Sequence, residues 1–186
     1  ELAHALRFME ALGETSIHEL NRVEFFTSHE GLNLHYESAL TRRVPRRDTY
    51  YDLSAHLPWI GDRTRRAEHA HVEFFRGVAN PVAIKLGPAA EPDETLSLLR
   101  ALNPANEPGK IILITRLGAA NVSKLLPPII RAVRDAKTPV LWACDPMHGN
   151  TIATSSGLKT RSFDAVLGEL DATFDAHASE GTLLGG

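Results

Sequence analysis

The feature that most constrains the fold is a short apolar segment that recurs five times along the chain. The five segments are predicted strands at residues 23–27, 50–53, 82–86, 111–115 and 140–144. None shows a clear alternation of apolar and polar residues, which is typical of a parallel sheet covered on both faces. Each segment ends abruptly in polar residues, as in LWACDPMHGN, where the apolar run stops at Asp145 and leads to His148.

Segments with helical spacing of apolar residues alternate with these strands. They are predicted helices at residues 1–12, 32–40, 64–78, 92–102, 121–136 and 161–180. Helix 92–102 begins with acidic residues, as the helix dipole favours, and the last helix carries apolar residues on one side. Residues 42–48 form a basic, proline-containing segment that we expect to be a solvated loop.

The alternation of strand and helix fits two α/β architectures, an open doubly wound sheet and a (β/α) barrel. No glycine-rich dinucleotide or phosphate-loop fingerprint follows any strand, which weakens the nucleotide-binding open sheet. An eight-unit barrel usually needs about 250 residues. Five units in 186 residues therefore predict an incomplete (β/α)8 TIM-type barrel, with residues 1–186 forming a single partial domain.

Composition excludes several classes of partner. The chain is 43% hydrophobic and 23% charged with a net charge of -3, so we expect neither nucleic acid nor an anionic membrane as a partner. No apolar run approaches the roughly 20 residues of a membrane span. The single cysteine, Cys144, excludes an intrachain disulfide and fits a reducing compartment. We expect no signal peptide, and a start at Glu1 rather than Met indicates processing, trimming or a fragment edge.

The polar residues that follow the strands are the candidate site, because the carboxyl ends of parallel strands gather on one face. They are His29, Glu30, His56, Asp62, Arg63, Lys85, Arg116, Asp145 and His148. Lys85 and Arg116 lie within or directly after apolar strands, where a cation is expensive to desolvate unless an anion meets it. Pairing with a structural carboxylate explains one such residue equally well, but the set, with Arg63, favours binding of a phosphate or carboxylate.

His148 fits a metal ligand, a general base or a structural histidine, and its place at a strand end favours the first two. Cys144 belongs to the apolar strand, so we expect a small buried side chain there and not a Cys/His metal site. Lys159 and Arg161 follow a Ser/Thr-rich loop and precede the last helix. They predict either a second anion site at the helix N-terminus or ordinary capping.

Seven blocks of the sequence together resemble a known family. They are FFTSHEGLNLHYE, YDLSAHLPWIGDRTR, HVEFFRGVANPVAIKLGP, LNPANEPGKIILITRLG, LPPIIRAVR, WACDPMHGNT and SSGLKTRSFD. In order and spacing they resemble class II (plant-like) 3-deoxy-D-arabino-heptulosonate 7-phosphate (DAHP) synthase. The resemblance implies a (β/α)8 barrel that condenses phosphoenolpyruvate with erythrose 4-phosphate and releases phosphate, the first step of the shikimate pathway. It also implies a divalent metal, Mn²⁺ or Co²⁺.

The resemblance assigns roles to individual residues. Arg63, Lys85 and Arg116 are implied to be the catalytic cations that bind phosphoenolpyruvate, and Lys159 to contact the aldose phosphate. His148 is implied to be a metal ligand. Two acidic residues complete the implied substrate-binding set: Asp62, which stands where the family often has Glu, and Glu30.

The chain also departs from the family pattern. The GECD-like motif with its cysteine ligand, a further arginine, and the later Glu and Asp ligands do not appear, so the resemblance covers barrel units three to seven and one of four metal ligands. One alternative is therefore a shortened, non-catalytic homologue that binds or regulates a complete synthase. Another is completion of the barrel by a second copy. We expect a homo-oligomer in the cytoplasm, or in the plastid of a plant.

Overall fold

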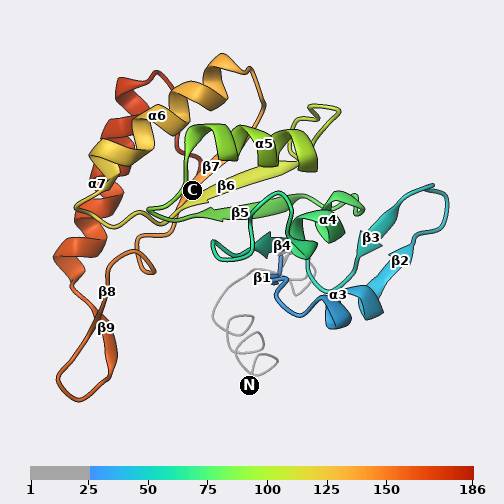
Figure 1. Ribbon diagram of the computed structural model, residues 1–186, viewed down its shortest axis with the longest axis horizontal. Coiled ribbons are helices and arrows are strands. Elements are labelled where there is room, and N and C mark those ends of the chain that lie inside the picture. The colour runs from blue at the N-terminus through green and yellow to red at the C-terminus, as the bar shows by residue number, and fades with distance from the viewer. Residues whose placement is uncertain (1–25) are drawn as a thin grey trace, which may run out of the picture.

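A computed structural model describes residues 26–186, and its centre is a five-stranded parallel sheet (Figure 1). The strand order is β1-β4-β5-β6-β7, which follows the order along the chain. The bounds are β1 Ser28–Glu30, β4 Leu57–Ile60, β5 Val82–Leu86, β6 Ile111–Thr115 and β7 Leu141–Cys144. The last residues of the chain extend along the outer edge of β7, where Gly185 N donates to Trp142 O at 2.9 Å.

The helices show that this sheet is wound as a barrel wall. They are α3 Leu34–Leu40, α4 Ala70–Arg76, α5 Pro92–Leu102, α6 Val122–Asp135 and α7 Phe163–Ser179. From α4 onward each helix packs against the next one (Figure 1). Right-handed crossovers between strands that follow one another in order place all their helices on one face, whereas a doubly wound sheet reverses its strand order. The predicted class, an incomplete α/β barrel, is therefore confirmed, and the doubly wound alternative is wrong.

The core lies between the sheet and this helix layer. Parallel register aligns Ile60, Ile84, Leu113 and Trp142 in one row across four strands, and all four are buried. The adjacent row contains Lys85, Ile114 and Ala143, whose side chains lie on the opposite face because successive residues of a strand alternate. These three are only partly buried, so helices cover one face of the sheet and not both, contrary to the expectation from the apolar strands.

The N-terminal third differs most from the prediction. The predicted helix 1–12 and residues 23–25 of the first predicted strand lie outside the described residues. The first strand of the sheet is instead Ser28–Glu30, and the second is Leu57–Ile60, two segments outside the predicted strands. Pro58 obscures the second strand in the sequence, because proline is rare in strands and removes a donor from the ladder.

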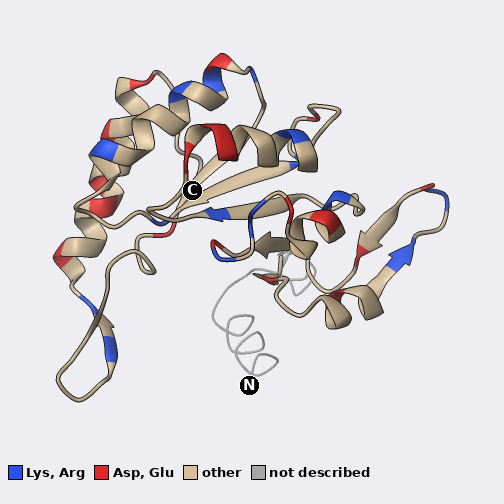
Figure 2. Ribbon diagram, viewed as in Figure 1, with Lys and Arg blue, Asp and Glu red and all other residues tan. Residues whose placement is uncertain are grey.

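The predicted strand at residues 50–53 exists but does not belong to the central sheet. Tyr50–Asp52 forms β3, which pairs antiparallel with β2, Thr41–Arg43. The basic segment expected to be a loop is therefore an exposed hairpin that projects from the body (Figures 1 and 2). Local contacts hold it: Arg43 pairs with Asp48, and Arg47 donates to the Tyr51 hydroxyl at 2.7 Å.

A second hairpin replaces the Ser/Thr-rich loop predicted before the last helix. It consists of β8 Thr151–Ala153 and β9 Lys159–Arg161, paired antiparallel, and it extends away from the sheet (Figure 1). The predicted helix 64–78 is likewise shorter, because only Ala70–Arg76 is helical. Within residues 26–186 no helix has the length and apolar character needed to cross a lipid bilayer.

The last helix packs through its polar side. Its buried residues are Glu169, Thr173, Ala176 and His177. The apolar residues that lie on one side of this helix include Phe163 and Phe174, which are 76% and 53% exposed. Hydrophobic spacing therefore identified the helix correctly, but it did not identify the side that packs on the neighbouring elements.

Candidate active site

An open cavity of about 520 Å³ lies at the carboxyl ends of the parallel strands. The residues that line it are Glu30, Trp59, Gly61, Asp62, Arg63, Lys85, Arg116, Asp145, His148, Thr151, Lys159 and Arg161. They include every residue to which the resemblance assigns a role, whereas two of the strand-end candidates, His29 and His56, lie outside the cavity lining. Five lining residues are Lys or Arg and three are Asp or Glu, so positive charge prevails in the cavity, and Figure 2 shows basic positions on β5 and β9.

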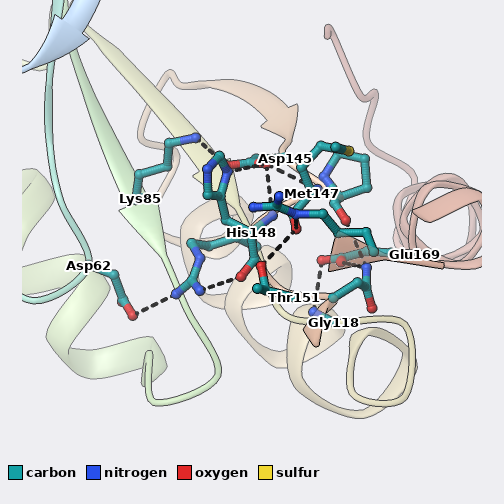
Figure 3. Close-up of polar contacts among 12 residues, drawn as sticks. Asp62, Lys85, Gly118, Asp145, Met147, His148, Thr151 and Glu169 are labelled. Atoms are coloured by element: carbon teal, nitrogen blue, oxygen red, sulfur yellow. Dashed lines mark hydrogen bonds and ion pairs between the residues drawn. The ribbon is translucent and has the colours of Figure 1, made fainter. Parts of the chain in front are cut away.

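Lys85 and Asp145 form the central ion pair of the cavity. Lys85 Nζ donates to Asp145 Oδ2 at 2.6 Å, and both side chains are largely buried, with exposures of 17% and 11% (Figure 3). Burial acts to raise the pKa of Asp145, but the hydrogen bonds and charges of Lys85 and His148 outweigh it and hold that pKa below its ordinary value. Lys85 also lies 5.5 Å from the centre of the Trp59 ring, a cation–π contact.

Asp145 also fixes the histidine at the cavity rim. The Nδ1 atom of His148 lies 2.7 Å from Asp145 Oδ2, and the backbone N–H groups of Met147 and His148 donate to Oδ1 at 3.1 and 3.3 Å (Figure 3). The sequence placed Asp145 among the strand-end residues without a role. Its role in the structure is to join Lys85 from β5 to His148 from the loop after β7.

Asp62 holds Arg116 in a second ion-pair network. Arg116 Nη1 donates to Asp62 Oδ2 at 3.2 Å, and Arg116 Nη2 donates to the backbone oxygen of His148 at 2.6 Å (Figure 3). The other carboxylate oxygen of Asp62 accepts from Gly87 N at 2.8 Å and from Arg65 Nε at 2.9 Å. Asp62 is thus occupied by protein donors, and it orients the guanidinium of Arg116.

Arg65 is a buried cation that no sequence pattern indicated. Its side chain is 4% exposed and lies between Asp62 and Glu94, with Nη1 2.6 Å from Glu94 Oε2. Burial lowers the pKa of Arg65, but its bonds to Glu94 and Asp62 outweigh that effect and raise the pKa above its ordinary value. The GDRTR segment therefore provides one structural arginine, Arg65, and one exposed arginine, Arg63.

Arg63 and Lys159 are the accessible cations of the cavity. Both are exposed, and within residues 26–186 neither forms an ion pair. Arg161 is partly buried and donates through Nε to the backbone oxygen of Met147 at 3.0 Å, which ties β9 to the loop that carries His148. The two hairpin cations therefore enter the cavity from β9, and not from the N-terminus of the last helix.

The residues present fit one metal ligand but not a complete metal centre. With Nδ1 of His148 engaged by Asp145, its Nε2 is the nitrogen available to a metal, the arrangement commonly found for histidine ligands. No group of three or more His, Cys, Asp or Glu side chains suited to a metal occurs between residues 26 and 186. Cys144 does not line the cavity that contains His148, and its sulfur lies 3.5 Å from the hydroxyl of Thr173 on α7.

Comparison with known proteins agrees with the architecture of this cavity. The model of the class-II DAHP synthetase family matches residues 1–186. The chain belongs to this family. The family resemblance expected from the sequence is therefore confirmed.

Three similar proteins come from a plant, a fungus and a bacterium. The chain is 53% identical over 190 residues to the probable chloroplastic phospho-2-dehydro-3-deoxyheptonate aldolase of Catharanthus roseus. It is 48% and 47% identical to proteins named phospho-2-dehydro-3-deoxyheptonate aldolase from Neurospora crassa and Streptomyces coelicolor. These matches cover 97–100% of the chain but only 38–41% of the relatives. The chain thus spans about two fifths of the length of the DAHP synthases it matches.

Proposed function

We propose that this chain forms the anion-binding wall of a DAHP synthase that condenses phosphoenolpyruvate with erythrose 4-phosphate and releases phosphate. The observation that carries the proposal is the positively charged cavity at the strand ends in a member of this family. Both substrates are anions, so holding them side by side requires several fixed cations. Family membership supports the proposed reaction. The charges that line the cavity support the choice of substrate-binding residues.

Lys85, Arg116 and Arg63 are the proposed groups for phosphoenolpyruvate. Lys85 acts as a point charge, and Arg116 offers a planar fork that suits a carboxylate or phosphate. Both are already oriented by carboxylates, Lys85 by Asp145 and Arg116 by Asp62, so little rotamer freedom is lost when an anion binds. Lys159 is the proposed contact for the phosphate of the aldose, and Glu30 is a further substrate-binding candidate in the cavity lining.

Asp62 supports this binding indirectly. Its oxygens accept from Arg116, Arg65 and the backbone of Gly87, which leaves it oriented toward protein donors. We therefore assign it the positioning of Arg116. This role also fits the resemblance, because a glutamate at the same place retains the carboxylate.

The metal dependence implied by the family rests on one residue here. His148 would donate Nε2 to a divalent ion such as Mn²⁺ or Co²⁺, with Asp145 holding the opposite ring nitrogen. When bound, such an ion polarises the aldehyde of the second substrate as a Lewis acid. The remaining ligands would come from outside residues 26–186.

The test is release of phosphate by the protein in its full natural length, with Mn²⁺ and both substrates. We expect release to require both substrates and to fall at least about 100-fold in the variants Lys85→Met and Arg116→Met, which remove cations from the cavity. Lys124→Met, which removes an exposed cation from α6, is the matched control and should leave the rate nearly unchanged. Absence of phosphate release from the unmodified protein contradicts the proposed reaction.

Residues 26–186 contain no group of three or more side chains suited to a metal, which favours one alternative, a non-catalytic homologue that binds a complete synthase. Titration with Mn²⁺ and co-purification with a full-length synthase distinguish the two. Tight one-to-one binding of Mn²⁺ by the isolated chain contradicts the alternative. Homo-oligomerisation and a location in the cytoplasm or a plastid remain predictions.

A further inference from the structure

We propose that Glu169 of α7 is a positioning residue that clamps the loop after β6 to the loop after β7, and so sets where Arg116 and His148 enter the cavity. The proposal rests on the proposed function only in treating these two residues as parts of the working site. Glu169 does not line the cavity, and no pattern in the sequence pointed to it.

The carboxylate of Glu169 connects three elements. Its Oε1 accepts from the backbone N–H groups of Leu117 and Gly118 at 2.7 and 2.9 Å, both just after β6. Its Oε2 accepts from Asn150 Nδ2 at 2.6 Å, in the loop after β7 (Figure 3). The residue is fully buried, with 0% exposure. All the observed donors are amides, so this carboxylate acts as an acceptor for loop N–H groups and not as half of an ion pair.

Asn150 closes the same connection from the other side. Its Oδ1 accepts from Ala119 N at 3.0 Å, and its Nδ2 also donates to the backbone oxygen of Pro146 at 2.8 Å. The two loops touch directly as well, because a Cβ added to Gly149 would lie 2.5 Å from the backbone nitrogen of Gly118. The glycines of LITRLG and DPMHGN thus allow the approach, and Glu169 holds it.

The functional residues are adjacent to this clamp in the chain. Arg116 directly precedes Leu117, and His148 lies two residues before Asn150. Arg116 also donates to the backbone oxygen of His148 at 2.6 Å, so the two loops share a contact inside the cavity. A shift of either loop would move both a cation and the histidine. Misplacement of such groups by about 1 Å commonly costs a factor of about 100 in rate.

The decisive variant is Glu169→Gln in the protein in its full natural length. Glutamine keeps one acceptor oxygen for Leu117 and Gly118, but it places an NH₂ group against the NH₂ group of Asn150. We expect kcat/KM to fall about 10- to 100-fold, the range seen when residues behind a functional side chain are changed. Adding Asn150→Asp restores a donor–acceptor pair between positions 169 and 150 but removes the bond from Asn150 to the backbone oxygen of Pro146, so we expect it to recover part of the loss.

Thr173→Val is the matched control. Thr173 is buried one turn further along α7 and donates to the backbone oxygen of Glu169 at 2.7 Å, but it has no bond to either loop. Both single variants should lower the thermal midpoint by a few degrees, yet only Glu169→Gln should alter kinetics by more than about threefold. Equal kinetics in the two variants, compared at the same fraction folded, would overturn the proposal.

A second readout separates this proposal from the proposed reaction. The affinity for inorganic phosphate, measured by calorimetric titration, does not require turnover, and we expect it to weaken about tenfold in Glu169→Gln and to recover in part in the double variant. If the unmodified protein binds phosphate without catalysis, the reaction is wrong, and the phosphate affinities still decide the clamp. If Glu169→Gln leaves phosphate affinity unchanged, the clamp is overturned whatever the activity.

Discussion

The ion pair of Lys85 and Asp145 predicts that substitutions of its two members change anion affinity in opposite directions. Lys85 Nζ donates to Asp145 Oδ2 at 2.6 Å, so an anion entering the cavity competes with Asp145 for this ammonium group. Lys85→Met removes the cation itself. Asp145→Asn removes only the competing charge and leaves an amide oxygen that can still accept from Lys85.

The expected magnitudes follow from the strengths of hydrogen bonds. A hydrogen bond to a charged group contributes about 1.5–3 kcal/mol and a neutral one about 0.5–1.5 kcal/mol. Loss of the Lys85 contact should therefore weaken phosphate binding about 10- to 100-fold, since about 1.4 kcal/mol corresponds to a factor of ten. Replacing the carboxylate of Asp145 by an amide weakens the competing bond by about 1 kcal/mol, and phosphate should bind about fivefold more tightly.

The assay is calorimetric titration with inorganic phosphate at low and at physiological ionic strength. Lys124→Met serves as the control for the loss of one surface cation. Asp145 uses one oxygen for Lys85 and the other for the backbone N–H of Met147, so an amide that still accepts from Lys85 loses the bond to Met147. Thermal unfolding of both variants checks that the fold survives. If Asp145→Asn weakens phosphate binding as much as Lys85→Met does, Asp145 supports the anion site and the competition argument is refuted.

Three further predictions concern stability. Gly149→Ala should lower the free energy of unfolding by about 1–3 kcal/mol and lower the thermal midpoint, because the added Cβ would lie 2.5 Å from the rigid backbone nitrogen of Gly118. Gly77→Ala is the milder comparison, since the nearest atom to its Cβ would be 3.3 Å away. Burial lowers the pKa of His177, so stability should be constant above the unfolded pKa of about 6.5 and fall below it, as the unfolded chain takes up the proton first. Urea unfolding between about pH 5 and pH 7.5 should show this slope, and its persistence in His177→Gln would contradict the assignment. Lys110→Met should lower the free energy of unfolding, measured by chemical denaturation, by about 2 kcal/mol, because Lys110 Nζ donates to the backbone oxygens of Val78 and Asn80 at 2.6 Å each. A decrease below about 0.5 kcal/mol would contradict this.

The middle of the chain could be predicted from its sequence almost residue by residue. The strands Val82–Leu86 and Ile111–Thr115 and the helix Pro92–Leu102 have the bounds expected from their apolar runs. Each packs through the apolar residues that define it, so the local pattern and the tertiary position agree. The same regularity placed Lys85 and Arg116 in one cavity, because the carboxyl ends of neighbouring parallel strands must meet.

The N-terminal part could not be assigned in the same way, since local propensity and tertiary position disagree there. Tyr50–Asp52 contains aromatic residues, which favour a strand, but this strand pairs with Thr41–Arg43 in a two-stranded hairpin and not with the central sheet. Leu57–Ile60 contains a proline and still occupies the second place in the parallel sheet, where Pro58 is opposite His29. Which of two short apolar segments enters a sheet depends on partners that are distant in the sequence.

The last helix shows the limit of hydrophobic spacing most clearly and explains why Glu169 escaped notice. A buried carboxylate is unfavourable by itself, so a pattern-based interpretation assigns such a residue to the exposed side. Burial acts to raise the pKa of Glu169 and prevails, although the N–H groups of Gly118, Leu117 and Asn150 act in the opposite sense. The compensating donors lie 19 to 52 residues away in two loops, and no periodicity within α7 indicates them. Burial of the Glu169 carboxylate is unfavourable, and its role explains it: the two carboxylate oxygens hold together the loops that carry Arg116 and His148.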